Sequence, residues 1–135
     1  MIGEDDQFGL RLAGKVVAVA HQVEKMLAES LVDAGLNASQ WLVLQTLTFS
    51  GEATMGDLAG ATGLPSPSLT RHVDGLVDRA LVFRRLDDAD RRRVVIHLST
   101  RGQGFVAERA GQLEELVGPL LREGGLMTPV TLGTA

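Results

Sequence analysis

The chain has no cysteine among its 135 residues, so it has no disulfide framework, no thiol redox switch and no cysteine-based metal site. It also has no run of about 18 apolar residues that could cross a membrane. Its N-terminus carries Glu4, Asp5 and Asp6, where a secretory signal would have a basic start and an apolar centre. These absences and the length predict one soluble, cytoplasmic domain without membrane contact.

The motifs of common enzymes are missing as well. There is no HExxH sequence, and the glycine-containing stretch 56–63 lacks the lysine of a phosphate loop. The histidines, His21, His72 and His97, fall on three different predicted elements, and no two have the i, i+4 spacing of a helical metal site. We therefore expect no enzyme activity, no cofactor and no metal. A small enzyme is kept only as an alternative hypothesis.

The formal net charge is −4, which by itself argues against nucleic acid as a partner. The distribution of charge is uneven, however. Residues 65–101 contain eight arginines and five aspartates, a balance of +3, whereas the rest of the chain has a balance of −7. A basic segment on an acidic body attracts phosphate locally. A bias of this size also arises by chance in many enzymes, so it supports DNA binding only together with the motifs below.

Apolar periodicity predicts helices at both ends of the chain. The first covers residues 7–32 and stops near Gly35, a residue suited to a left-handed cap. The last begins at Ser99 or Thr100 and ends at Gly124, and we expect no stable element in the short tail 124–135. The apolar positions of this last helix are Phe105, Val106, Leu113, Leu116, Val117, Leu120 and Leu121.

Three shorter helices are predicted between the terminal ones. Asn37 with Gln40, and Thr54 with Asp57, form capping boxes that open the first two. The third follows the turn 62–65, runs from an N-cap at Ser66 to about residue 79, and has proline at its first helical position. The side chains expected to face the core are Trp41, Leu42, Leu44, Leu47, Met55, Leu58, Ala61, Leu69, Val73 and Leu76.

A short helix, a glycine-containing turn and a capped helix make a helix-turn-helix, whose second helix enters the major groove with its N-terminal residues on base edges. Outward positions here include Ser66, Ser68, Thr70, Arg71, Asp74 and Gly75, with His72 nearby. Hydroxyl groups bond phosphates or bases, and arginine binds guanine through two hydrogen bonds. The alternatives are capping alone for the two serines and a solvated surface role for Arg71.

Residues 81–98 predict a β-hairpin with a charged tip, that is, a wing. Because side chains alternate along a strand, successive tip arginines cannot all point the same way. We expect Arg92 to enter the minor groove, with Asp90 orienting its guanidinium. Phosphate contacts are expected from Arg91 and Arg93, and from Arg84 and Arg85 on the facing strand. The alternative is a charged loop that only keeps the hairpin soluble.

These motifs resemble the MarR family of winged helix-turn-helix transcriptional regulators. The resemblance covers about residues 8–123 and depends on residues 36–41 at the opening of the second helix, on Leu58-Ala59 and 65–73 in the helix-turn-helix, and on the wing. In the wing, Asp90-Arg91-Arg92-Arg93 is followed by Leu98-Ser99 and Gly102, similar to the family's Asp-x-Arg tip, Leu-Thr closure and nearby glycine.

The resemblance implies an α+β, mostly helical fold in which Arg92 is the minor-groove arginine, Asp90 its orienting carboxylate and 66–71 the start of the recognition helix. It also implies a homodimer with intertwined terminal helices and, in some members, a small aromatic or anionic effector that weakens DNA binding. Two departures stand out. Ala80 occupies the place of a usual glycine before the wing, and the C-terminal arm is short.

The residues themselves also argue for a dimer. The first helix is apolar on more than one side, and a winged helix of about 70 residues cannot cover it and the last helix. A two-fold contact is the commonest solution, while packing of the two arms within a monomer is the alternative. We expect a DNA-binding part at 36–99 and dimerisation helices at 7–34 and 100–123.

The predicted function is a DNA-binding regulator, more often a repressor, on a pseudo-palindromic operator. A protein-interaction module without DNA binding is the alternative. Contacts to double-stranded DNA are expected from Ser66, Ser68, Thr70, Arg71, His72, Arg84, Asp90, Arg91, Arg92 and Arg93.

Overall fold

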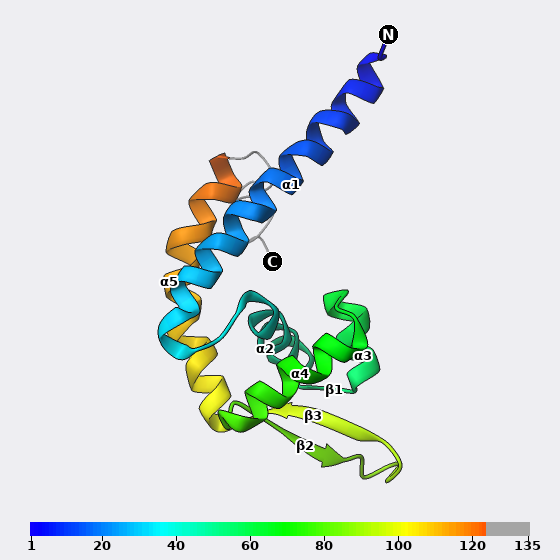
Figure 1. Cartoon of the computed structure of the whole chain (residues 1–135), viewed down its shortest axis with the longest axis vertical. Coiled ribbons are helices and arrows are strands. Elements are labelled where there is room, and N and C mark those ends of the chain that lie inside the picture. Colours follow the sequence, from blue (N-terminus) through cyan, green and yellow to red (C-terminus); the bar gives the residue numbers. More distant parts are fainter. Residues whose placement is uncertain (124–135) are drawn as a thin grey trace, which may run out of the picture.

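A long N-terminal helix projects from a small winged-helix body in the computed structural model, which describes residues 1–123 (Figure 1). The elements in chain order are α1 (Glu4–Leu31), the 3-10 turn η1 (Val32–Ala34), α2 (Ala38–Ser50), β1 (Glu52–Ala53), α3 (Met55–Thr62), α4 (Ser66–Asp78), β2 (Val82–Leu86), β3 (Val94–Leu98) and α5 (Thr100–Glu123). The predicted α+β winged helix is confirmed. The expected end of the last helix at Gly124, and the tail, lie outside the described residues.

The predicted start signals of α2 and α3, and the predicted stop near Gly35, are confirmed. Both capping boxes form: Asn37 Oδ1 accepts from Gln40 N at 2.8 Å, and Thr54 Oγ1 accepts from Asp57 N at 3.0 Å. Each satisfies amide groups that the first helical turn leaves without an intrahelical partner. Gly35 ends η1 in the left-handed region with φ of 70°.

The core lies between α2, α3, α4 and the sheet. Leu44, Leu58, Leu69, Val73 and Ile96 are almost completely buried, and together with their apolar neighbours they form one cluster. Two predictions about this core are wrong. Leu42 is 38% exposed because α2 turns Val43, not Leu42, into the core, and Ala61 lies on the outer side of α3.

The sheet is antiparallel, with strand order β1-β3-β2. The predicted hairpin is present, but β1 was not predicted, since two residues are too short to show an alternating pattern. His97 links the strands: its ring stacks on Phe83 of β2 at 5.2 Å, and its Nε2 lies 3.2 Å from Glu52 Oε2 of β1. The wing is therefore anchored at its base to the segment that joins α2 and α3.

The helix α5 returns alongside the C-terminal half of α1 (Figure 1). Arg109 of α5 fixes this junction, because its guanidinium makes a bidentate pair with Asp33 at 2.8 and 3.0 Å and donates to the Ser30 carbonyl. It also lies over the Phe105 ring, 5.1 Å from the centroid. The Arg109 hydrogen bonds hold the pKa of Asp33 below its usual value.

The N-terminal half of α1 has no such partner within residues 1–123. Its exposed apolar side chains are Phe8, Leu10, Leu12, Val16 and Val17. Figure 1 shows this part of α1 projecting past the described end of α5. No helix in the described part of the chain is long and apolar enough to span a membrane.

Candidate nucleic-acid interface

The recognition helix α4 presents one polar face and buries the other. Leu69, Val73 and Leu76 are buried as predicted, so the helix is held firmly against the body. Ser66, Thr70 and Arg71 are exposed, while Ser68 and His72 are half-buried. The N-terminal half of α4, where a major-groove helix contacts bases, therefore carries exposed hydroxyl and guanidinium groups.

The predicted N-cap at Ser66 is wrong. Pro65 takes the cap position in an extended conformation, its carbonyl accepts from Leu69 N at 2.9 Å, and no side chain caps the helix. The rigid φ of Pro65 supplies the entry geometry that the sequence analysis assigned to a serine side chain. The Ser66 hydroxyl is thus not engaged as a cap.

The other two hydroxyl groups donate to the helix backbone. Ser68 Oγ donates to the Pro65 carbonyl and Thr70 Oγ1 donates to the Ser66 carbonyl, each at 3.0 Å. In this arrangement each oxygen keeps its lone pairs for a further partner. Among these groups, the Arg71 guanidinium is therefore the strong donor that the N-terminal half of α4 offers outward.

His72 and Gly75 face α2 rather than open solvent. His72 Nδ1 lies 3.4 Å from Asn37 Nδ2, and the His72 carbonyl accepts from Gln40 Nε2 at 3.3 Å. A Cβ at Gly75 would lie 2.6 Å from Gln40 Nε2, so the prediction that this residue points outward is wrong. This contact depends on how α4 packs against α2, and the sequence of α4 alone does not predict that packing.

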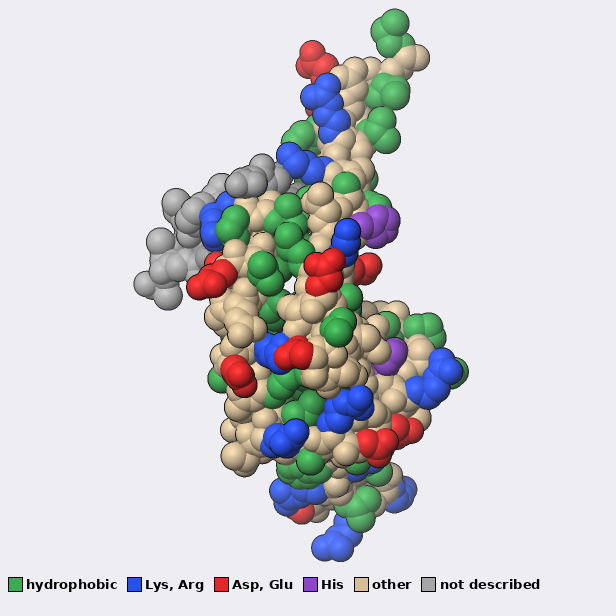
Figure 2. Space-filling view, turned by 60° about the vertical axis from the view of Figure 1, so that its left-hand side comes forward, with side chains coloured by type: hydrophobic (Ala, Val, Ile, Leu, Met, Phe, Trp, Pro, Cys, Tyr) green, Lys and Arg blue, Asp and Glu red, His purple; other side chains and the backbone are tan. Residues whose placement is uncertain are grey.

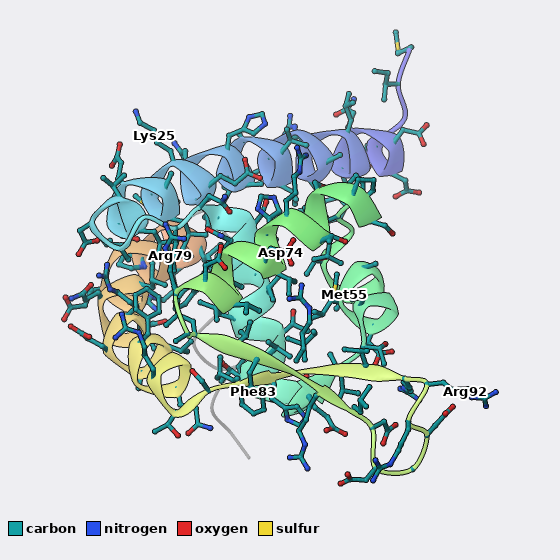
Figure 3. The ribbon with its side chains drawn as sticks, turned by 60° about the horizontal axis from the view of Figure 1, so that its bottom comes forward. Lys25, Met55, Asp74, Arg79, Phe83 and Arg92 are labelled. Carbon is teal, nitrogen blue, oxygen red and sulfur yellow. The ribbon has the colours of Figure 1, made fainter. Side chains whose placement is uncertain are left out.

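The wing tip orders one arginine and leaves its side chain in solvent. Asp90 Oδ1 accepts from Arg92 N at 3.1 Å and from Arg92 Nε at 3.2 Å. The Arg92 side chain is nevertheless 92% exposed, and Figure 3 shows it reaching away from the hairpin. These hydrogen bonds from Arg92 lower the pKa of Asp90, so the carboxylate stays ionised at neutral pH. Asp90 and Arg92 thus have the predicted geometry of an oriented, outward guanidinium.

The remaining wing arginines are divided between ion pairs and solvent. Arg93 lies between Asp57 of α3 and Asp87, at 3.9 and 3.8 Å, and Arg84 pairs with Asp74 of α4. Arg85 lies 3.5 Å from Asp88. Arg91 is exposed, and no ion pair within residues 1–123 includes it.

The Arg84 and Arg93 pairs connect the wing to the helix-turn-helix. From the sequence, Asp57 was expected only as part of a capping box and Asp74 only as an outward residue of α4. Surface ion pairs of this kind contribute little stability. They do hold Arg84 beside α4 and Arg93 beside α3. Figure 2 shows basic side chains gathered at the wing end of the molecule.

The turn that leads from α4 into the wing contains the residue that departs from the family pattern. Ala80 has φ of 58°, and it is the one non-glycine residue with positive φ in the described range 1–123. Ser99 Oγ donates to the Ala80 carbonyl at 2.6 Å and accepts from Gly102 N at 2.9 Å. The neighbouring contacts thus hold Ala80 in a conformation that disfavours a side chain.

The glycine that follows the wing, Gly102, is required by close backbone packing. A Cβ there would lie 2.1 Å from the Leu81 carbonyl oxygen, which is closer than any real contact. The start of α5 therefore packs directly on the backbone that enters the wing. Ser99, Gly102 and Ala80 form one junction that sets the wing's direction.

The arrangement of α3, α4 and the β2–β3 hairpin defines a winged helix-turn-helix. No group of three or more potential metal ligands is found in the part of the chain that the structure describes. A sequence profile of the MarR family matches residues 34–93. The chain belongs to the MarR family of transcriptional regulators.

Individual relatives support this assignment. The HTH-type transcriptional regulator YsmB of Bacillus subtilis is 32% identical over 90 residues, which cover 67% of this chain and 62% of YsmB. A MarR family regulator from Silicibacter pomeroyi has a similar structure, with a TM-score of 0.77, 27% identity, and coverage of 87% of this chain and 76% of that one. The chain spans 62–65% of the length of the curated relatives it matches.

The fold is also shared with BpsR of Bordetella bronchiseptica, whose DNA binding is regulated by 6-hydroxynicotinic acid. The TM-score is 0.71 at 22% identity, with 89% of each chain covered.

Proposed function

We propose that this protein is a transcriptional regulator that binds a pseudo-palindromic DNA operator as a homodimer and represses transcription. The single observation that carries the proposal is the wing tip, where Asp90 orients a guanidinium that remains 92% exposed. A protein-docking wing has no need of an ordered, solvent-facing arginine. A narrow A·T-rich minor groove, with its strong negative potential, attracts such a group.

The recognition helix would read the major groove in the same complex. Arg71 would donate two hydrogen bonds to a guanine, the commonest specific contact of arginine with DNA. Ser66, Ser68 and Thr70 would accept from base amino groups, while His72, turned toward α2, would lie at the edge of the contact. Arg91 would bind phosphate directly. Arg84 and Arg93 would also bind phosphate, either while keeping their ion pairs with the carboxylates of α4 and α3 or after breaking them.

A second copy of the chain would cover the projecting part of α1. The exposed side chains from Phe8 to Val17 form an apolar surface that a monomer has no means of burying within residues 1–123. In the homodimer, residues 7–34 and 100–123 would make the dimer contact and residues 36–99 would bind DNA. Two recognition helices related by a two-fold axis require a pseudo-palindromic site.

A small effector would control DNA binding from the junction between the arm and the body. A cleft of about 490 Å³ lies between α1 and the start of α2, with Val19, Leu27 and Leu42 among its lining residues. The regulated relative BpsR supports an effector in general terms. No catalytic role is proposed for any residue of the chain.

The test is selection of bound sequences from random duplexes by the purified protein, followed by affinity measurements over a salt series. We expect enrichment of an inverted repeat and a log–log salt slope of about −0.9 for each phosphate contact. Failure to enrich any sequence, with binding that barely responds to salt, would instead favour a protein-interaction module.

A further inference from the structure

The outer face of the wing sheet carries three side chains in one row, one from each strand, which we call the outer row. Glu52 of β1 is paired with His97 of β3, and His97 is paired with Phe83 of β2. The planes of the His97 and Phe83 rings differ by 10°, and Glu52 Oε2 lies 3.2 Å from His97 Nε2. Ala53 and Ile96, the next pair along β1 and β3, are buried on the core face, as the alternation of side chains requires. The outer row therefore joins the three strands from the solvent side.

The outer row lies at the base of the hairpin, whereas the DNA-contacting arginine lies at its tip. Val82 pairs with Leu98 at the base, and the outer row is the next residue pair along the hairpin. Figure 3 shows Phe83 near this base and Arg92 at the opposite end. A two-stranded hairpin by itself is marginally stable and strongly twisted. Its pairing with β1 through the outer row therefore restricts the direction in which the hairpin projects.

A small tilt at the outer row becomes a large displacement at the tip. From His97 to Val94 the strand extends about 10 Å, and Arg92 lies beyond its end. A tilt of about 10° at the row therefore moves Val94 by roughly 2 Å. The minor groove is only about 6 Å wide, so a shift of this size misaligns a guanidinium that enters it. Asp90 cannot correct such a shift, because it moves together with Arg92.

The ion pairs that connect the wing to α3 and α4 do not replace the outer row. The side chains of Arg84 and Arg93 are 38% and 53% exposed, and surface pairs of this kind contribute little. In the proposed complex both arginines also bind phosphate, which weakens their hold on Asp74 and Asp57. The His97 side chain, by contrast, is only 20% exposed and lies between two strands. The outer row is therefore the part of the wing's anchorage that DNA leaves in place.

We infer that Glu52, His97 and Phe83 are positioning residues for Arg92. Through the outer row they set the angle at which the wing brings the Arg92 guanidinium into the minor groove, without contacting DNA themselves. This inference rests on the proposed function, since it assigns the three residues to the same DNA contact.

The sign of the effect separates positioning from simple electrostatics. Removal of a carboxylate near a DNA-binding surface reduces repulsion of phosphate and by itself strengthens binding. A positioning role predicts the opposite, weaker binding, for Glu52→Ala. Asp88→Ala is the matched control, because it removes a wing carboxylate that pairs with Arg85 instead of His97, and it should not weaken binding.

The test is a double-mutant cycle with Arg92→Ala, measured as the Kd for a duplex taken from the selection experiment. With Arg92 present, Glu52→Ala and Phe83→Thr should each weaken binding about 3- to 10-fold, because each disrupts the outer row. In the Arg92→Ala background, each should change the Kd by less than about 2-fold, since there is no guanidinium left to position. Both variants should stay folded by circular dichroism, because the Glu52 side chain is 59% exposed and Phe83 is 41% exposed.

The possible outcomes distinguish this inference from the proposed function. Equal losses with and without Arg92 would assign the outer row to stability alone, and unchanged or tighter binding by Glu52→Ala and Phe83→Thr would show that it does not position the wing. Either result would overturn the inference and leave the proposed function intact. A wild-type chain that binds no duplex would overturn both.

Discussion

The winged-helix body, residues 36–99, and the projecting half of α1 differ in how far their apolar side chains are buried. In the body, Leu44, Leu58 and Leu69 are buried inside the chain itself. Along α1, Leu10 is 63% exposed and Phe8 is 70% exposed. Hydrophobic residues scattered singly on a surface are normal, but exposed apolar residues on more than one side of a helix mark a contact site. The buried residues of the body therefore stabilise the fold of one chain, whereas the exposed residues of α1 indicate contact with a second molecule.

The largest expected effect comes from a core leucine. Leu69→Ala should lower the free energy of unfolding by about 2–5 kcal/mol, because it removes buried methyl groups and leaves a cavity. Leu10→Ala on the arm is the matched control, and at low protein concentration it should change stability by less than about 0.5 kcal/mol. Urea denaturation of both variants measures the difference. Equal losses would contradict the contrast between body and arm.

The next effect concerns the junction behind the wing. Gly102→Ala should destabilise the protein by about 1–3 kcal/mol, because the new methyl group would overlap the Leu81 carbonyl and force the backbone apart. The same substitution at Gly104, whose Cβ would meet nothing within 4 Å, serves as the control. Thermal unfolding of the two variants compares them, and equal melting temperatures would contradict the assigned contact.

The arm is tested by charge. Val17→Asp places a carboxylate among the exposed apolar residues of α1, so it should shift the protein from dimer to monomer while the circular dichroism of the body is retained. Val94→Asp changes an exposed valine of β3, outside the proposed dimerisation helices, and should leave the dimer intact. Sedimentation velocity reports both. A Val17→Asp protein that remains fully dimeric would exclude the Val17 side of α1 from the interface.

The smallest effect is expected at Ala80. Ala80→Gly should raise the free energy of unfolding by about 0.5–1 kcal/mol. Glycine adopts the left-handed conformation without the steric cost that alanine has, and this gain outweighs the added flexibility of glycine in the unfolded chain. Chemical denaturation measures this gain. A loss of stability would show that the Ala80 methyl group makes contacts that compensate for its conformation.

Local signals in the sequence predicted local structure well. Asn37 with Gln40, Thr54 with Asp57 and Asp90 with Arg92 each act over two or three residues, and all three interactions are present. The hairpin followed from the wing motif, whereas the special position of Ala80 followed from the resemblance to the family. These features depend on backbone geometry that neighbouring residues determine among themselves.

Interactions between elements were not predictable in the same way. Arg84 pairs with Asp74 and Arg93 approaches Asp57 only because the wing and the helix-turn-helix are packed together. Leu42 and Ala61 fit the apolar stripes of their helices, yet each lies just outside the surface that the neighbouring elements cover. Periodicity shows which side of a helix is apolar, whereas the edge of the buried area depends on the packing partners.

The most direct test of the account is the affinity of Arg92→Ala for a duplex taken from the selection experiment. We expect Arg92→Ala to lose about 1–3 kcal/mol in binding free energy, roughly 5- to 150-fold in Kd, with unchanged stability, because the removed guanidinium is exposed in the free protein. Lys25→Ala removes the same charge far from the wing and should bind normally (Figure 3). Full-strength DNA binding by Arg92→Ala would contradict the role assigned to the wing.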